Sequence, residues 1–402
     1  MSSRDTILRI SKLVGKIVAR FIFYFSIIVI VALLLAQVKP VQTFLTKKIL
    51  VALSERTMHD VSISSVKIAW LDRAELNDLL ILDRESDTLA YASRILVNYR
   101  LTDILNSKFL NVEEVIVDQM HLQLIKRDSL SLLNLSELLN VLKKPNKKNK
   151  PLSVESVSLA NLDFSVNNNA KEPIENRLDL AHLDMSLSEM EFANFRLTND
   201  TVMVDVIQLS GIESRHGLEI RELSSRLELN NQSLSLTNLN LRTASSQVSD
   251  SIKFYYDGIA NLSDFVDSVS FGLYFSNTRI SAADLKIMTG LDVFKSSFRI
   301  DGTIWGKVQD FNMDHSRIGF GRESFIRGGL SSFGLPNLKS TFILADITDS
   351  HIVPEDIEPY VGQISENIEQ LGRVDFTGSF AGFLNDFVAR GDFVTEKGSV
   401  HS

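Results

Sequence analysis

The chain has 402 residues, of which 44% are hydrophobic, and its 50 acidic side chains outnumber its 42 basic ones. The net charge of −8 argues against nucleic acid as the main partner, because phosphate binding needs a concentrated basic face. The chain contains no cysteine, which excludes disulfides, thiolate catalysis and cysteine-held zinc. Its length suits either two or three ordinary domains or one extended repeat.

The segment from Phe21 to Ala36 predicts a transmembrane helix. Only Ser26 in it is not apolar, and it carries no charge. Its residues span about 24 Å as a helix and, with their apolar flanks, approach the roughly 30 Å hydrocarbon core. A cleaved signal peptide is the alternative, but its apolar region is usually about 7–15 residues and precedes a small-x-small site. We therefore predict an uncleaved anchor over residues 21–38, with Phe21, Ile28 and Leu35 in the membrane.

The residues on either side of this anchor predict its orientation. Residues 1–20 hold several basic side chains and a single acidic one, Asp5, so we expect this tail to be cytoplasmic. Everything after Lys39 would then lie in the periplasm. Residues 41–58 place apolar side chains at helical spacing, which predicts an amphipathic helix. This helix fits the membrane surface or the start of the next domain, and an ordinary core helix fits the pattern equally well.

From Asp60 onward apolar and polar residues alternate, which is typical of β-strands. Such runs begin at Val61, Val112 and Val154, and residues 224–243 resemble a hairpin that turns at Asn230-Asn231-Gln232. Roughly twenty to twenty-five short segments of this kind predict a mainly β architecture over residues 60–402. Short helices are expected within residues 101–108, 133–144 and 355–372. The basic run at 143–151 predicts a hydrophilic loop.

A glycine-spaced template occurs twice, as IDGTIWGKVQDF from Ile300 and as FTGSFAGFLNDF from Phe376. On a strand, its apolar residues and glycines point to one side, and glycine inside a strand marks a bend or the close approach of another chain. A sandwich core is the alternative to an open trough. We assign the following residues to one apolar interior: Ile300, Ile304, Val308, Phe376, Phe380, Leu384, Leu227 and Leu229. The expected bends are at Gly302, Gly306, Gly378 and Gly382.

No catalytic or metal-binding motif is complete in this sequence. The seven histidines are scattered and lack metal-type spacing. The run Asp83 to Asp87 resembles the start of a calcium loop, but Arg94 stands where the closing glutamate belongs, so a hairpin turn is the better interpretation. No nucleophile-elbow, phosphate-loop or HExxH motif occurs. We expect no enzymatic activity, no cofactor and no bound metal.

The N-terminal part of the chain resembles the start of the TamB/AsmA-like proteins of diderm bacteria, in their Bacteroidota form. The resemblance lies in the order of its segments: a basic tail, an anchor, an amphipathic helix and then VSISSVKIAWLDRAELNDLLILDRESDTLAYASRILVNY. Two later stretches are similar to the repeating strands of that family: SSFRIDGTIWGKVQDF and GRVDFTGSFAGFLNDFVARGDFVTEKGSV. The resemblance implies an inner-membrane anchor and a β-taco, a U-shaped sheet whose inside is a hydrophobic groove crossing the periplasm. The chain is much shorter than typical members, so we expect it to correspond to an N-terminal portion.

Two functions follow as expectations. One is a bridge that carries phospholipid along the groove toward the outer membrane. The other is an assembly factor for outer-membrane proteins that acts with a barrel partner of the TamA type, using a free sheet edge for strand addition. An apolar interior favours the first function and a free edge favours the second.

Overall fold

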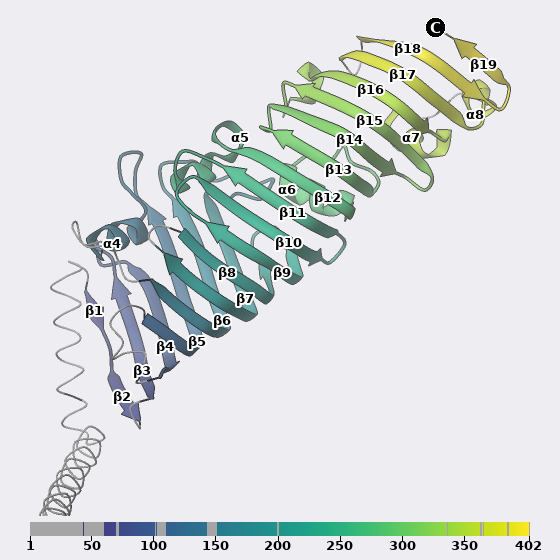
Figure 1. Cartoon of the computed structure of the whole chain (residues 1–402). Helices are drawn as coiled ribbons and strands as arrows, with labels where there is room; N and C mark the ends of the chain where they lie inside the picture. Colours follow the sequence, from purple (N-terminus) through teal and green to yellow (C-terminus); the bar gives the residue numbers. More distant parts are fainter. Residues whose placement is uncertain are drawn as a thin grey trace, which may run out of the picture.

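The computed structural model describes residues 43, 60–69, 72–100, 102, 110–142, 151–198, 201–335, 337–361, 364, 366–383 and 386–401. In this part the chain forms one sheet of 19 strands and a few short helices, so the prediction of a mainly β protein is confirmed (Figure 1). Within the same part, no helix has the length and hydrophobicity to cross a membrane. The predicted anchor, including Phe21, Ile28 and Leu35, lies outside the described residues, as does the predicted helix at 41–58 apart from Thr43.

The elements follow one another along the chain with few long connections. The helices are α4 (Asn134–Leu142), η1 (Ile259–Asp264), α5 (Phe265–Ser268), α6 (Ala282–Thr289), η2 (Leu338–Ser340), α7 (Pro354–Val361) and α8 (Glu366–Glu369). The strands are β1 (Val61–Ser62), β2 (Ser65–Ala69), β3 (Arg73–Leu82), β4 (Thr88–Asn98), β5 (Leu110–Lys126), β6 (Leu152–Asn168), β7 (His182–Thr198), β8 (Thr201–Glu213), β9 (Glu219–Leu229), β10 (Ser233–Thr243), β11 (Gln247–Tyr255), β12 (Ser270–Ile280), β13 (Phe298–Gly306), β14 (Asp310–Phe320), β15 (Ser324–Phe333), β16 (Phe342–His351), β17 (Val374–Phe383), β18 (Asp386–Thr395) and β19 (Gly398–His401).

The strands are arranged as a meander. From β3 to β19 each strand pairs with the next, and every pair is antiparallel except β5 and β6, which are parallel. Both β1 and β2 pair with β3, at opposite ends of that strand. Figure 1 shows the strands crossing the long axis of the ribbon, one after another, from β1 to β19. At about 4.8 Å per strand the ribbon is about 80 Å long.

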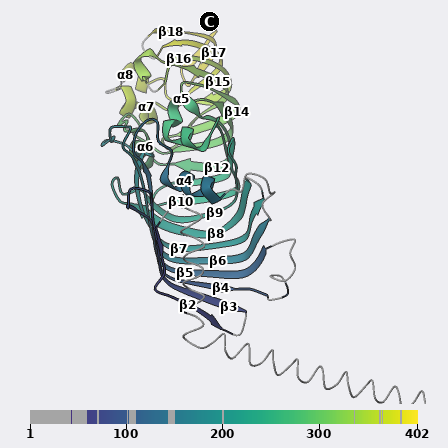
Figure 2. The ribbon, with the colours of Figure 1, turned by 90° about the vertical axis from the view of Figure 1, so that its left-hand side faces the viewer.

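The strands are sharply bent, and Figure 2 shows them curving like a U when the ribbon is seen from its N-terminal end. The bends coincide with residues in the left-handed region, with φ between 46° and 58°: Asp78, Gln119, Asn161, Asn194, Asn238, Asn277 and His315. Asparagine and aspartate tolerate this conformation better than most residues do. Pairing skips these positions, as between Ala92–Met120 and Arg94–Asp118, so the strand direction changes without loss of the sheet.

The hydroxyl groups of serine and threonine satisfy backbone groups beside these bends. Ser93 Oγ donates to the carbonyl of Asp118 at 2.7 Å, and Ser225 Oγ donates to the carbonyl of Thr237 at 3.0 Å. Thr278, which is fully buried, accepts a hydrogen bond from the N–H of Ser249 at 3.1 Å. A bulge leaves backbone groups without a ladder partner, so these hydroxyls lower the cost of bending the sheet.

The short helices lie in the connections at the ends of strands. Asn134, the first residue of α4, accepts the N–H of Ile125 at 3.0 Å and donates to the carbonyl of Gln123 at 3.2 Å. The pairing of β4 with β5 stops at Leu122, so the amide of Asn134 bonds to the backbone of β5 just beyond that point. The helices expected within 133–144 and 355–372 are confirmed as α4 and as α7 with α8. Most of residues 101–108 and residues 143–150 lie outside the described part.

Candidate functional site

One face of the sheet is lined by apolar side chains in register, and we call it the apolar face. Residues that pair directly across two strands point to the same side of a sheet. Val204 on β8 pairs with a residue on β9, that residue pairs with one on β10, and the pairing continues in this way to β18. Every residue in this series is apolar. This row takes one residue from each strand between β8 and β18: Val204, Leu227, Leu236, Ile252, Leu273, Ile304, Met313, Leu330, Ala345, Phe380 and Ala389.

A second row runs parallel to the first and lies two residues away from it on each strand that the two rows share. It begins on β6 and is apolar except for two glycines and a serine: Leu152, Leu197, Val202, Leu229, Leu234, Phe254, Phe271, Gly306, Phe311, Ser332, Ile343, Gly382 and Phe387. In both copies of the sequence template, the second glycine pairs with the phenylalanine of the closing Asp-Phe, as Gly306 with Phe311 and Gly382 with Phe387. The template therefore encodes a hairpin in which a glycine stands opposite a bulky ring.

The N-terminal strands continue the apolar face. A row of Val66, Leu76, Ile95, Val117, Leu159, Met190 and Leu209 crosses β2 to β8. Val117, Met190 and Leu187 of this half are buried, whereas Ile207 and Gln208 on the opposite face are exposed. No second sheet covers the apolar face in the described part of the chain. We infer from this difference in burial that the apolar face lies on the inside of the bend. Helix α5 covers part of this face, where the ring of Phe265 contacts that of Phe254 with centroids 5.1 Å apart.

The structure places most of the residues that the sequence predicted on this face. Ile304, Phe380 and Leu227 belong to the first row and Leu229 to the second. Ile300 pairs with Ile318, and Phe376 stacks on Phe393 with ring centroids 4.5 Å apart. Sequence reasoning did not single out Met313, Leu330 or Leu273, which complete the first row. Their alternation with polar neighbours is the signal that would have found them, once the hairpin register is known.

One residue of the predicted set stands elsewhere, and one lies outside the described residues. We placed Val308 on the same strand as Ile304, and this prediction is wrong. β13 ends at Gly306, and Lys307 and Asp310 exchange backbone hydrogen bonds of 2.8 and 3.1 Å, so Val308 lies in the hairpin turn. The alternation of the template continues past the end of the strand, which hides the turn in the sequence. The equivalent residue of the second copy, Leu384, lies outside the described residues.

The four template glycines all have positive φ values, 136° at Gly302, 134° at Gly306, 152° at Gly378 and 148° at Gly382. A Cβ atom on Gly378 would lie 2.0 Å from the carbonyl oxygen of Arg390, and one on Gly302 would lie 2.6 Å from Cα of Ser316. The neighbouring strand thus approaches too closely for any side chain. Beside Gly328 and Gly329 the apolar face has a hollow of about 30 Å³, bounded by Met313, Ile318 and Ile347 among others.

The opposite face, which we call the polar face, carries charged pairs across neighbouring strands. The ion pairs include Lys67–Glu75 at 3.0 Å, Arg94–Asp118 at 3.5 Å and Arg226–Asp205 at 2.8 Å. The basic side chain of each pair is largely exposed, so each pair contributes little to stability. Their effect is to keep one face of the sheet soluble while the other stays apolar.

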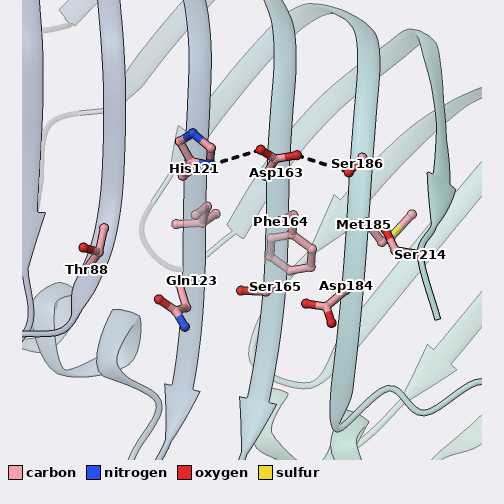
Figure 3. Close-up of a pocket in the computed structure, with 11 residues that line it drawn as sticks. Thr88, His121, Gln123, Asp163, Phe164, Ser165, Asp184, Met185, Ser186 and Ser214 are labelled. Atoms are coloured by element: carbon pink, nitrogen blue, oxygen red, sulfur yellow. Dashed lines mark hydrogen bonds and ion pairs between the residues drawn. The ribbon is translucent and has the colours of Figure 1, made fainter.

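A polar hollow of about 370 Å³ lies over β5, β6 and β7 (Figure 3). Asp163 accepts a hydrogen bond from Ser186 Oγ at 3.1 Å and lies 3.1 Å from His121 Nδ1. The serine therefore bonds to the aspartate and not to the histidine, so the trio does not form the nucleophile–base pair of a hydrolase. Among the described residues, no group of three or more His, Asp or Glu side chains could hold a metal ion. The run Asp83 to Asp87 forms the turn between β3 and β4, where Asp83 accepts the N–H of Glu85 and of Asp87 at 3.0 Å each.

Comparison with known proteins adds no assignment. The chain matches no protein-family model, and a search of curated proteins finds no significant match.

Proposed function

We propose that this chain is an inner-membrane-anchored bridge that carries phospholipid through the periplasm toward the outer membrane. The bent sheet acts in this proposal as a β-taco, and its apolar face as the floor and walls of a hydrophobic groove. The observation that carries the proposal is the unbroken apolar row from Val204 to Ala389, which passes through every strand from β8 to β18. The resemblance of the sequence to TamB/AsmA-like proteins supports the same function.

Lipid transfer between membranes is limited by the cost of exposing acyl chains to water. Each methylene exposed costs about 0.8 kcal/mol, so two chains of about sixteen carbons resist leaving a bilayer by on the order of 20 kcal/mol. An apolar surface without interruption lowers this cost at every step of the path. No position has to bind the lipid tightly, and no sharp motif is needed. The headgroup stays at the open side of the U, in water.

Assembly of outer-membrane proteins with a TamA-type barrel was the alternative from the sequence. It requires a free sheet edge for strand addition, and it does not require an apolar interior. The rows on the apolar face therefore favour lipid carriage over this alternative.

The proposal is tested by the lipid content of the intact chain. The chain is purified in detergent, its fold is checked by circular dichroism, and bound lipid is extracted and identified by mass spectrometry. We expect phospholipid in the wild type and a loss of at least fivefold when Leu273 and Leu330 are both changed to Asp. A folded wild-type chain without phospholipid would contradict the proposal.

A further inference from the structure

Four arginines gather on the polar face of neighbouring strands, and we call them the arginine patch. They are Arg279 on β12, Arg299 on β13, Arg317 on β14 and Arg327 on β15, and all four are exposed. The register places Arg279 directly opposite Arg299, and Arg317 directly opposite Arg327. Like charges in directly opposed positions destabilise a sheet, so this arrangement opposes the stability of the isolated chain.

The patch differs from the rest of the polar face in its lack of acidic partners. Arg94, Arg226 and Arg242 each form an ion pair with an acid on the adjacent strand. Within the described residues, no arginine of the patch has a carboxylate within 4.0 Å, although Asp301 stands opposite Arg317 and Asp349 opposite Arg327 in register. Four positive charges therefore face two negative ones, in a chain whose net charge is −8.

The sheet holds two of these side chains in place. The guanidinium carbon of Arg317 lies 4.1 Å from the ring centroid of Phe325, and that ring is stacked on His351 with centroids 5.9 Å apart. Arg299 Nη2 donates to the carbonyl of Arg322 at 3.2 Å. Each guanidinium has five N–H donors, so most of them remain available to a partner. A side chain that is fixed before binding loses less entropy when a partner arrives.

We propose that the arginine patch docks an acidic segment of a partner protein. Guanidinium groups bind carboxylates through two parallel hydrogen bonds, and a partner's carboxylates would remove the repulsion between opposed arginines. A bilayer is the other anionic surface to consider. The patch begins about ten strand spacings, or about 50 Å, from the first strand of the ribbon, too far for the membrane that holds the proposed anchor. This choice between partners rests on the proposed function, whereas the patch itself does not.

The test uses the full chain in detergent micelles and a fluorescent peptide of ten glutamates as the probe, read by anisotropy. The variant Arg279→Glu/Arg317→Glu turns both like-charge pairs into opposite-charge pairs, but it also places a carboxylate opposite Asp301 and removes the contact with Phe325. These effects oppose each other, so we expect Tm to change by only a few degrees. Peptide affinity should fall at least tenfold. The control is Arg196→Glu/Arg390→Glu, which changes the net charge equally at exposed arginines outside the patch. We expect the control to weaken binding by less than twofold.

This experiment tests the docking proposal separately from the proposal of lipid carriage, because peptide binding does not involve the apolar face. Equal losses in the variant and the control mean non-specific attraction and overturn the proposal. Absence of peptide binding by the wild type also overturns it. If phosphatidylglycerol added to the micelles binds in a patch-dependent way and the peptide does not, the patch contacts lipid and the assignment to a protein partner is wrong.

Discussion

Asp356 shows how a single side chain fixes the end of a hairpin. It belongs to α7, but its carboxylate accepts the N–H groups of Arg322, Glu323 and Ser324 at 2.8, 3.0 and 2.9 Å, in the turn that joins β14 and β15. The side chain is buried, and its two carboxylate oxygens accept all three N–H groups. A contact between a helix and a turn 32 residues away in sequence has no local signal, so it was not predicted.

Removing this carboxylate should destabilise the ribbon locally. We expect Asp356→Ala to lower the free energy of unfolding by about 1–3 kcal/mol, because a buried N–H without a partner costs about that much. Urea unfolding followed by circular dichroism measures the change. Glu355→Ala is the control, since the side chain of Glu355 is exposed and should cost little. Equal effects of both substitutions would contradict the role assigned to Asp356.

The same residue predicts a dependence on pH. Burial raises the pKa of Asp356, but the three backbone N–H groups outweigh it and hold the pKa below its usual value. A lowered pKa contributes stability above the unfolded pKa of about 3.9, and this contribution is lost as the pH falls through the folded pKa. Between pH 5 and pH 3 the wild type should therefore lose more stability than Asp356→Asn, which cannot ionise. Tm values at both pH values provide the comparison, and identical slopes would contradict it.

Residues on the two faces should respond differently to a new charge. Ile304 and Phe380 are only half-buried, so an aspartate at either position can reach water through the open side of the U. We expect Ile304→Asp and Phe380→Asp to shift Tm by only a few degrees and to lose bound phospholipid. The control is Ser379→Asp, next to Phe380 on the exposed polar face, which should keep its lipid. A control that loses as much lipid as Phe380→Asp would show that the apolar face has no special role.

At the scale of elements, the repeated unit is the hairpin with its glycines. Gly378 and Gly398 have nearly the same φ, 152° and 153°, but only Gly378 has a neighbouring backbone within reach of an added Cβ. We expect Gly378→Ala to cost more than Gly398→Ala, because both substitutions introduce a strained φ of order 1–3 kcal/mol and only the first adds a clash. Urea midpoints of the two variants give the answer. If Gly398→Ala is as harmful as Gly378→Ala, backbone strain alone explains the glycines.

The sequence predicted which elements form better than where they bend or end. Alternation identified the strands because one face is apolar along the whole ribbon. The alternation in β5 passes from Val117 to Met120, and this change of phase falls at Gln119, one of the left-handed residues. Without the register, such a change cannot be told from a strand end. At Val308 the strand ends although the alternation continues. The apolar side chain of Val308 extends the pattern of β13, so the turn was not predicted.

At the scale of the whole molecule, the ribbon is held by nearest-neighbour strand pairing. Each strand from β3 onward is bonded to its neighbours in the meander, and among the described residues no strand is bonded to one that lies far from it along the ribbon. We infer that this arrangement leaves much of the apolar face accessible, which a sealed sandwich cannot do. The described residues form 19 strands, slightly fewer than the twenty to twenty-five expected from the sequence. The glycine-spaced template and the apolar rows are both parts of this one surface.

The predicted anchor concerns the whole molecule, because it would determine which end of the ribbon meets a membrane. We expect the purified chain to require detergent and to retain its N-terminus, since Phe21 to Ala36 has no suitable cleavage site after it. Intact-mass measurement of the membrane-extracted protein checks this. A mature chain beginning near Gln37 would mean that the segment is a signal peptide.

The central claim is that lipid travels along the apolar face, and site-specific photo-crosslinking tests it most directly. A photoreactive phenylalanine analogue is placed at Leu227, Ile304 or Phe380 on the apolar face, and at Arg226, Trp305 or Ser379 on the polar face of the same three strands. After irradiation of the full chain in cells, adducts are identified by mass spectrometry. The account predicts phospholipid adducts at all three apolar-face positions and none at their polar-face neighbours. Lipid adducts at neither face, or equally at both, would contradict it.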